Sequence, residues 1–173
     1  MSDSSKAATA KPTKGSAFRA ILWGGLICGV VDITAAIITT LAYGRSPLRM
    51  LQGIASGVLG ARSFEGGLKT SALGLLLHFV IAFGATIVYY AASRKLTFLI
   101  RQAIISGMLY GIAVYFFMQR VVLPLSAVGP RGPVRIPQLI IGLIVHMFCV
   151  GLPIALVIRH YSKPAGHELP AHV

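Results

Sequence analysis

Acidic residues are scarce in this sequence: Asp and Glu together number 4, against 16 Lys plus Arg, in a chain of 173 residues. The resulting formal charge of +12 is a pattern that nucleic-acid-binding proteins also show. Here, however, the basic residues mark the ends of apolar stretches instead of forming one stripe, as is typical of membrane proteins. We therefore expect contact with a lipid bilayer and its anionic headgroups, and no nucleic-acid partner.

Cysteine and catalytic motifs are also scarce. The two cysteines, Cys28 and Cys149, have neither CxxC nor zinc-ligand spacing, and we interpret both as small packing residues. The sequence contains no nucleophile elbow, Walker loop, dinucleotide fingerprint or HExxH pattern. These absences predict a protein that is not an enzyme, with no catalytic residues and no metal site.

Long apolar runs dominate the sequence, because 55% of the residues are hydrophobic and the mean hydropathy is +0.79. A bilayer-spanning helix needs about 20 residues, and four runs are that long: 20–43, 70–92, 103–125 and 136–158. Backbone groups in lipid must bond within their own segment, so these runs are predicted to be helices. We expect an all-α membrane protein, with a four-helix transmembrane bundle at 16–161 between a disordered cytoplasmic tail at 1–15 and a polar C-terminal tail at 162–173.

The four runs divide into two similar halves. Gly-x-x-x-Gly occurs in the first and third runs, and Gly-Leu-x-x-His occurs in the second and fourth. Both halves run in the same direction across the membrane, so a duplication would give two parallel two-helix repeats; chance similarity is the alternative. Small residues let helices approach closely, and the predicted packing positions are Gly25, Gly29, Gly74, Gly107, Gly111 and Gly142.

The connection after the first run is long enough to hold a further helix. Pro47 can begin a short helix with one apolar face, which leaves Gln52, Gly53 and Ser56 elsewhere on its surface. The segment is too short to cross a bilayer. We predict that it lies in the membrane interface or re-enters the membrane partway.

Ionisable residues inside the apolar runs form the candidate intramembrane polar site. Asp32 shares a helix face with Gly25 and Gly29, so we expect it to point into the bundle. It is either a proton-carrying or cation-binding group, or a residue that fixes helix packing. His78 and His146 lie at similar depths and can face each other across the bundle.

Three roles are open for these two histidines. They could relay protons or contact a substrate, hold a b-type haem as its two axial ligands, or form interhelical hydrogen bonds. Gln119 and Arg120 lie near the outer end of the third run. Arg120 is expected either to extend to the headgroups or to pair with Asp32 or an anion.

Charged and aromatic residues at the ends of the runs indicate orientation. The Arg94-Lys95 turn favours a topology with both termini in the cytoplasm. Aromatic side chains near run ends are typical of interfacial anchors; those predicted here are Trp23, Tyr43, Tyr89, Tyr90 and Tyr161.

The layout resembles the YagU-like proteins, a group of uncharacterised bacterial inner-membrane proteins. The resemblance is carried by four segments: the Gly-rich 25–31, the His-containing 70–84, 107–124 ending at a proline, and 142–146 before a basic tail. It implies a location in the bacterial inner membrane. It carries over no catalytic or binding residue.

The leading expectation for function is a structural, accessory or stress-related role, as a homo-oligomer or with a membrane partner protein. The main alternative is a small proton- or ion-coupled transporter or channel that uses Asp32, His78 and His146. A second alternative is a bis-histidine haem protein, which would carry haem b as its cofactor; otherwise no cofactor is expected.

Overall fold

The computed structural model describes residues 14–129, 132 and 134–162, and no strand occurs among them. Four helical segments in this part of the chain are long and apolar enough to cross a membrane: Gly15–Ala42, Gly67–Lys95, Ala103–Leu125 and Ile136–Ser162. The predicted all-α class and the four apolar helices are thereby confirmed. Most of the two predicted tails lies outside the described residues.

The first helix, α1 (Lys14–Ala42), ends in a turn at Gly44. Gly44 has φ 64°, a left-handed conformation that glycine adopts without steric cost. The backbone N–H of Gly44 donates to Leu41 and that of Arg45 to Thr40, which satisfies carbonyls left open at the helix end. The chain can therefore turn directly into the short helix that follows.

That short helix is α2 (Pro47–Leu59), which leads through a 3₁₀ turn, η1 (Gly60–Phe64), into α3 (Gly67–Lys95). Its polar side packs against α3: Gln52 is 3% exposed and donates to the Gly67 carbonyl at 3.1 Å. A Cβ at Gly74 of α3 would overlap the Leu51 carbonyl of α2. The predicted apolar face is only partly turned away from this contact: Val58 is 62% exposed, whereas Ala55 is fully buried beside Gly74.

The second half begins with the short helix α4 (Phe98–Arg101) and contains two helices interrupted by π-helical turns. The third span consists of α5 (Ala103–Phe117), the π-helical η2 (Met118–Val122) and α6 (Leu123–Leu125). The fourth consists of α7 (Ile136–Val145), the π-helical η3 (His146–Gly151) and α8 (Leu152–Ser162).

The sequence analysis did not predict these π-helical segments. Each segment ends two residues before a proline, Pro124 or Pro153. Proline has no N–H to donate and clashes with the carbonyl four residues earlier, so the ordinary helical ladder cannot continue through it. The wider turn is one way in which a helix accommodates that interruption.

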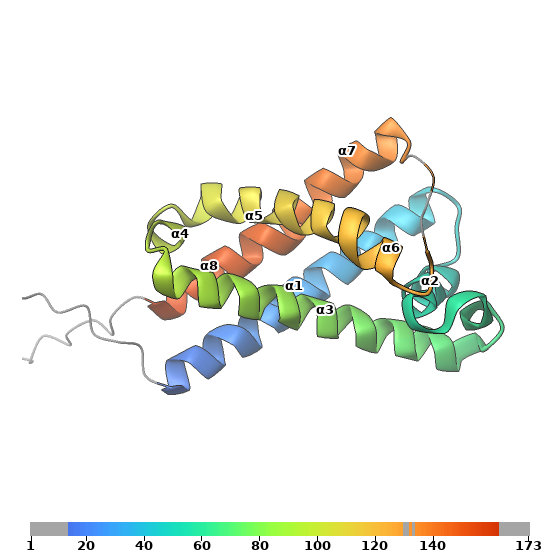
Figure 1. Cartoon of the computed structure of the whole chain (residues 1–173), viewed down its shortest axis with the longest axis horizontal. Helices are drawn as coiled ribbons and strands as arrows, with labels where there is room; N and C mark the ends of the chain where they lie inside the picture. The colour runs from blue at the N-terminus through green and yellow to red at the C-terminus, as the bar shows by residue number, and fades with distance from the viewer. Residues whose placement is uncertain (1–13, 130–131, 133, 163–173) are drawn as a thin grey trace, which may run out of the picture.

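The helices pack unevenly along the length of the molecule (Figure 1). Helix α1 contacts α3 and α8, and α5 contacts η3 and α8. The start of α1 meets the end of α8, where the Ser16 hydroxyl donates to the Tyr161 carbonyl at 2.8 Å. Most of the buried core belongs to this half of the molecule, and its apolar members are Ala20, Cys28, Ala82, Tyr89, Ala103, Val150, Ile154, Ala155 and Ile158.

Tyr89 corrects one expectation from the sequence. We predicted an interfacial anchor, but the side chain is 1% exposed and its hydroxyl donates to the Leu99 carbonyl at 3.0 Å. Its ring also contacts that of Tyr110, with centroids 4.9 Å apart. Proximity to the end of an apolar run was a poor guide, because the short α4 turn folds α5 back over this part of α3.

The outward faces of the four long helices carry large apolar side chains. Only 11% to 28% of the residues in the most apolar window of each helix are buried inside the protein. Leu76, Leu109 and Ile38 are each more than 60% exposed. A surface this apolar would be unfavourable in water and matches a hydrocarbon environment.

Candidate functional site

Glycines bring the helices around the site into close contact. In α1, Gly25 faces the ring of Phe83 and Gly29 faces that of Phe79, both on α3. In α5, Gly107 faces the Gly151 carbonyl. A Cβ at any of these glycines would come within 3.0 Å of its neighbour, a distance that requires the neighbour to shift.

The remaining packing positions have similar partners. A Cβ at Gly111 would overlap the His146 carbonyl, and one at Gly142 would press on the ring of Tyr115. Together with Gly74 of α3, which packs against α2, all six predicted glycines therefore lie at close contacts between elements of the chain. The close approach of α1 to α3 and of α5 to η3 positions the polar side chains described next.

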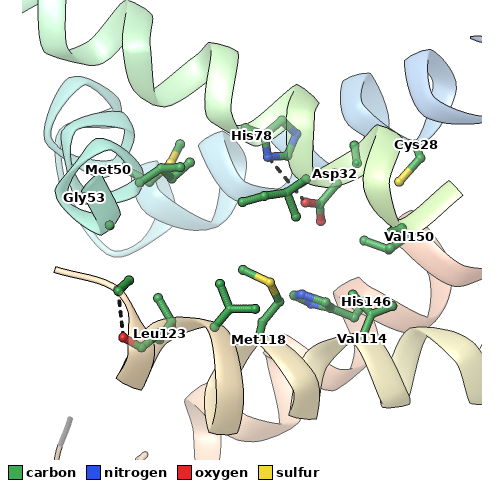
Figure 2. Close-up of a pocket in the computed structure, with 17 residues that line it drawn as sticks. Cys28, Asp32, Met50, Gly53, His78, Val114, Met118, Leu123, His146 and Val150 are labelled. Carbon is green, nitrogen blue, oxygen red and sulfur yellow. Dashed lines mark hydrogen bonds and ion pairs between the residues drawn. The ribbon is translucent and has the colours of Figure 1, made fainter. Parts of the chain in front are cut away.

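Asp32 and His78 form the titratable centre of the site (Figure 2). Nδ1 of His78 lies 3.9 Å from Oδ2 of Asp32, and the two side chains are 11% and 20% exposed, respectively. Nε2 of the same ring lies 2.9 Å from the carbonyl oxygen of Gly29. A carbonyl can only accept, so Nε2 carries a proton, and Nδ1 of the neutral ring has a free lone pair.

A proton between these two groups reconciles their positions. A neutral His78 would point its Nδ1 lone pair at an ionised Asp32, which is repulsive. Either a protonated Asp32 or a protonated His78 removes this repulsion. In both states one of the two groups carries the additional proton, and the two atoms are 3.9 Å apart, beyond the range of a direct hydrogen bond.

His146 opens the π-helical segment η3 and faces the same space. Its Nδ1 lies 2.9 Å from the Gly142 carbonyl one turn earlier, so Nδ1 is the donor and Nε2 of the neutral ring is free to accept. The ring contacts Tyr115 edge to face, with centroids 5.2 Å apart. This contact and the hydrogen bond fix the orientation of the imidazole.

Asp32, His78 and His146 line one cavity of about 390 Å³. Met50 and Gly53 of α2 lie at one end of the labelled lining and Cys28 and Val150 at the other, as Figure 2 shows. Most of the wall is apolar, so these three side chains are its main polar groups. The structure thus brings together three residues that the sequence analysis placed in one intramembrane polar site.

A second cavity of about 460 Å³ shares Asp32 and His146 with the first. It extends along α1 past Thr39 and Thr40 to Tyr43 and Arg45 at the end of that helix. The carboxylate therefore lies where a cavity covered by α2 meets one that leads towards a basic end of the molecule. A proton or small ion could reach Asp32 through this second cavity.

Gln119 and Arg120 do not join the site. Both belong to the π-helical segment η2, but neither lines the two cavities that contain Asp32. Arg120 is exposed and Gln119 is half-buried. The sequence reasoning that grouped them with Asp32 considered depth along the helix but not the direction of the side chain.

Other residues of the cavity wall were missed by sequence reasoning. Met118 and Val122 of η2 and Met50 and Gly53 of α2 line the cavity. Apolar and small side chains carry no chemical signal of their own. The Leu-Pro pair that follows both η2 and η3 is the one sequence feature that could have marked these turns, and π-helical turns often occur at functional sites.

The residues fit a proton better than a metal ion. Among the described residues, no three His, Cys, Asp or Glu side chains gather closely enough to hold a metal. A bis-histidine haem would need a free nitrogen from each ring. Nε2 of His78 donates to Gly29 and its Nδ1 faces Asp32, so haem ligation would have to displace one of these contacts.

Comparison of the chain with models of known protein families, with characterised proteins and with solved structures found no match.

Proposed function

We propose that this chain is a multi-pass membrane protein that binds and moves protons, or cations in exchange for protons, at Asp32, His78 and His146. The single observation that carries this proposal is the 3.9 Å approach of His78 Nδ1 to Asp32 in a cavity of about 390 Å³ between apolar helices. An unpaired charge at such a depth costs about 2.5–3.5 kcal/mol on insertion scales. Residues at this cost are commonly functional.

The proposed architecture is a four-helix bundle of two parallel repeats. The second glycine of each Gly-x-x-x-Gly lies beside the histidine of the following span, although through different atoms: the Gly29 carbonyl accepts from the His78 ring, and Gly111 packs against the His146 backbone carbonyl. The α2 helix would be an addition to the first repeat. It would lie at or partway into the membrane surface and cover the cavity.

The proposed location is the bacterial inner membrane, with both termini in the cytoplasm. The contact of Ser16 with Tyr161 supports a common side for the start of α1 and the end of α8. Arg94 and Lys95, in the last turn of α3, would lie on that side as well. The opposite side would carry α2 and the end of the second cavity at Arg45.

Proton movement in liposomes tests the proposal. The purified protein is reconstituted around a pH-sensitive dye, and proton flux is recorded under an imposed membrane potential and after addition of organic cations. Asp32→Asn should abolish the flux seen under either condition, since the amide keeps the shape of the carboxyl group but does not ionise in this pH range. Glu65→Gln makes the same chemical change at an exposed position and should leave the flux unchanged.

Wild-type flux in Asp32→Asn would contradict the proposal, as would a wild-type protein that moves no protons under either condition. The same purified sample addresses the haem alternative, because a haem absorption band that disappears in His78→Ala would favour a haem site over the proton site.

An accessory or stress-related role, as a homo-oligomer or beside a partner protein, stays a prediction. Purification in mild detergent tests it by showing whether a partner or a second copy accompanies the chain.

A further inference from the structure

An apolar groove on the outer surface of the protein adjoins the cavity that contains Asp32, with side chains common to both walls. The groove, of about 510 Å³, lies between α3 and α5 and continues along η2. It shares five residues with the cavity: Ile81, Ala85, Val114, Met118 and Val122. Polar groups contribute almost nothing to its wall, so it suits a hydrocarbon body better than an ion or a sugar.

The groove opens towards the surroundings of the helices. Val88 and Phe117 line it and are 59% and 57% exposed. The hydroxyl of Tyr110 donates to the Ala85 carbonyl at 2.7 Å and so joins α3 to α5 beside the groove. Gly84 leaves open space, because a Cβ there would meet nothing within 4 Å. In a bilayer, an apolar molecule would reach this opening from the lipid.

The polar end of the cavity presents acceptors and no strong free donor. The ring N–H groups of His78 and His146 are already bonded to the carbonyls of Gly29 and Gly142. Once Asp32 is ionised, its carboxylate, His78 Nδ1 and His146 Nε2 all accept. The thiols of Cys28 and Cys149 also lie near Asp32 and are weak donors, whereas Tyr43 and Arg45 line the far part of the second cavity, beyond Thr39 and Thr40. A ligand that satisfies this end must bring N–H or O–H groups and, to balance the carboxylate, a positive charge.

We propose, building on the proton-binding function above, that the site takes lipophilic primary amines in their ammonium form, which reach it through the groove between α3 and α5. The apolar body lies in the groove and the ammonium lies at Asp32. As it binds, the acid proton of the Asp32–His78 pair leaves to water, and the carboxylate accepts an ammonium N–H in its place. One positive charge enters the site and one proton leaves it.

The second cavity gives the proton a separate path. It meets the first at Asp32 and His146 and leads past the threonine hydroxyls of α1 towards Arg45. The amine and the proton would therefore reach Asp32 from different directions: the amine through the apolar groove, and the proton through the more polar second cavity. Exchange of one for the other at Asp32 would couple amine movement to proton movement.

Octylamine binding to the purified protein in a weakly buffered detergent solution tests the proposal. We expect saturable binding with release of about one proton for each amine bound, as required when both compete for a single carboxylate. Octanol and octanoate have the same chain but no ammonium, and should release none. Asp32→Asn should abolish proton release and weaken octylamine binding by roughly tenfold or more.

A substitution that fills the groove tests the access path independently of the polar site. Gly84→Trp should weaken octylamine binding roughly tenfold or more by filling the groove, while the protein keeps its thermal stability. Gly84→Leu is a smaller plug in case the tryptophan disturbs folding. Gly15→Trp introduces the same side chain at another open glycine, far from the groove, and should leave binding unchanged.

The outcomes are distinct for the two proposals. Absence of saturable octylamine binding, octanol binding as tightly as octylamine, or wild-type affinity in both Asp32→Asn and the Gly84 variants would overturn the amine site. Asp32-dependent proton flux in liposomes together with no octylamine binding would leave the proton function standing and remove only the amine. Octylamine binding with proton release, in a protein that moves no protons across liposomes, would support the amine site and contradict the proposed proton transport.

Discussion

The two histidines that end the Gly-Leu-x-x-His motifs make different hydrogen bonds. His78 donates through Nε2 to Gly29 on a neighbouring helix, whereas His146 donates through Nδ1 to Gly142 on its own helix. The motif predicts that both side chains lie at a similar depth, but it does not determine which nitrogen of each ring donates the hydrogen bond. His146 begins a π-helical turn, whereas His78 lies inside a regular helix. The two rings therefore meet different neighbours.

A buried serine allows a test at the same scale. Ser63 is fully buried, and within the described part of the chain its hydroxyl has no hydrogen-bond partner. Ser63→Ala removes a polar group whose burial is uncompensated, so we expect the free energy of unfolding to rise by about 1 kcal/mol. Thermal unfolding in detergent micelles measures the change.

Ser71 provides the matched comparison. It is also buried, but its hydroxyl lies 3.2 Å from the Leu48 carbonyl and 3.1 Å from that of Gly67. Ser71→Ala should therefore lower stability by about 1 kcal/mol. Equal losses in Ser63→Ala and Ser71→Ala would show that Ser63 has a partner after all.

Among whole elements, the spanning helices were predictable and the π-helical turns were not. Hydropathy alone indicates the apolar run from 103 to 125, because a span must be apolar over about 20 residues. Hydropathy does not distinguish a π turn from an α turn at Met118–Val122, since it depends on composition and not on the direction of each side chain. The depth of Arg120 was predictable in the same way, but its direction depends on that unpredicted turn.

The spacing of the glycines predicted the helix contacts better than the positions of the aromatic residues did. The packing role of Gly29 and Gly111 could be inferred from spacing, because a side chain at a close crossing has no room. The burial of Tyr89 could not, because it depends on α5 folding back over α3. Asp32 and His78 were predicted to share a site, but their 3.9 Å separation required the structure.

The contact between α5 and η3 gives a prediction at this scale. Gly111→Ala places a methyl group against the His146 carbonyl, where backbone and not a flexible side chain would have to move. We expect a loss of about 1–3 kcal/mol, the usual cost of overpacking, measured by thermal unfolding in detergent. Gly84→Ala makes the same change where nothing lies within 4 Å and should be neutral or slightly stabilising. A Gly111→Ala protein as stable as wild type would contradict the close contact.

Across the whole molecule, most of the firm packing lies towards one end and most of the open space lies further along, with Cys28, Ala82 and Val150 at the boundary. The half that holds the start of α1, the end of α8 and the α4 turn contains most of the buried core. The cavities lie further along, between α1, α3, the two π-helical turns and α2. A firmly packed half would keep the helices together while the other half admits a proton or ligand.

Acidic residues are so few that one of them can be followed directly. Infrared difference spectra between neutral and acidic pH, recorded on the protein in liposomes, report carboxyl groups as they gain a proton, and the chain has only 4 acidic side chains. The account predicts a carboxylic-acid band that is lost in Asp32→Asn, kept in Glu65→Gln and shifted in His78→Gln, because His78 Nδ1 lies 3.9 Å from that carboxyl group. An unchanged spectrum in Asp32→Asn would contradict the claim that Asp32 binds the proton.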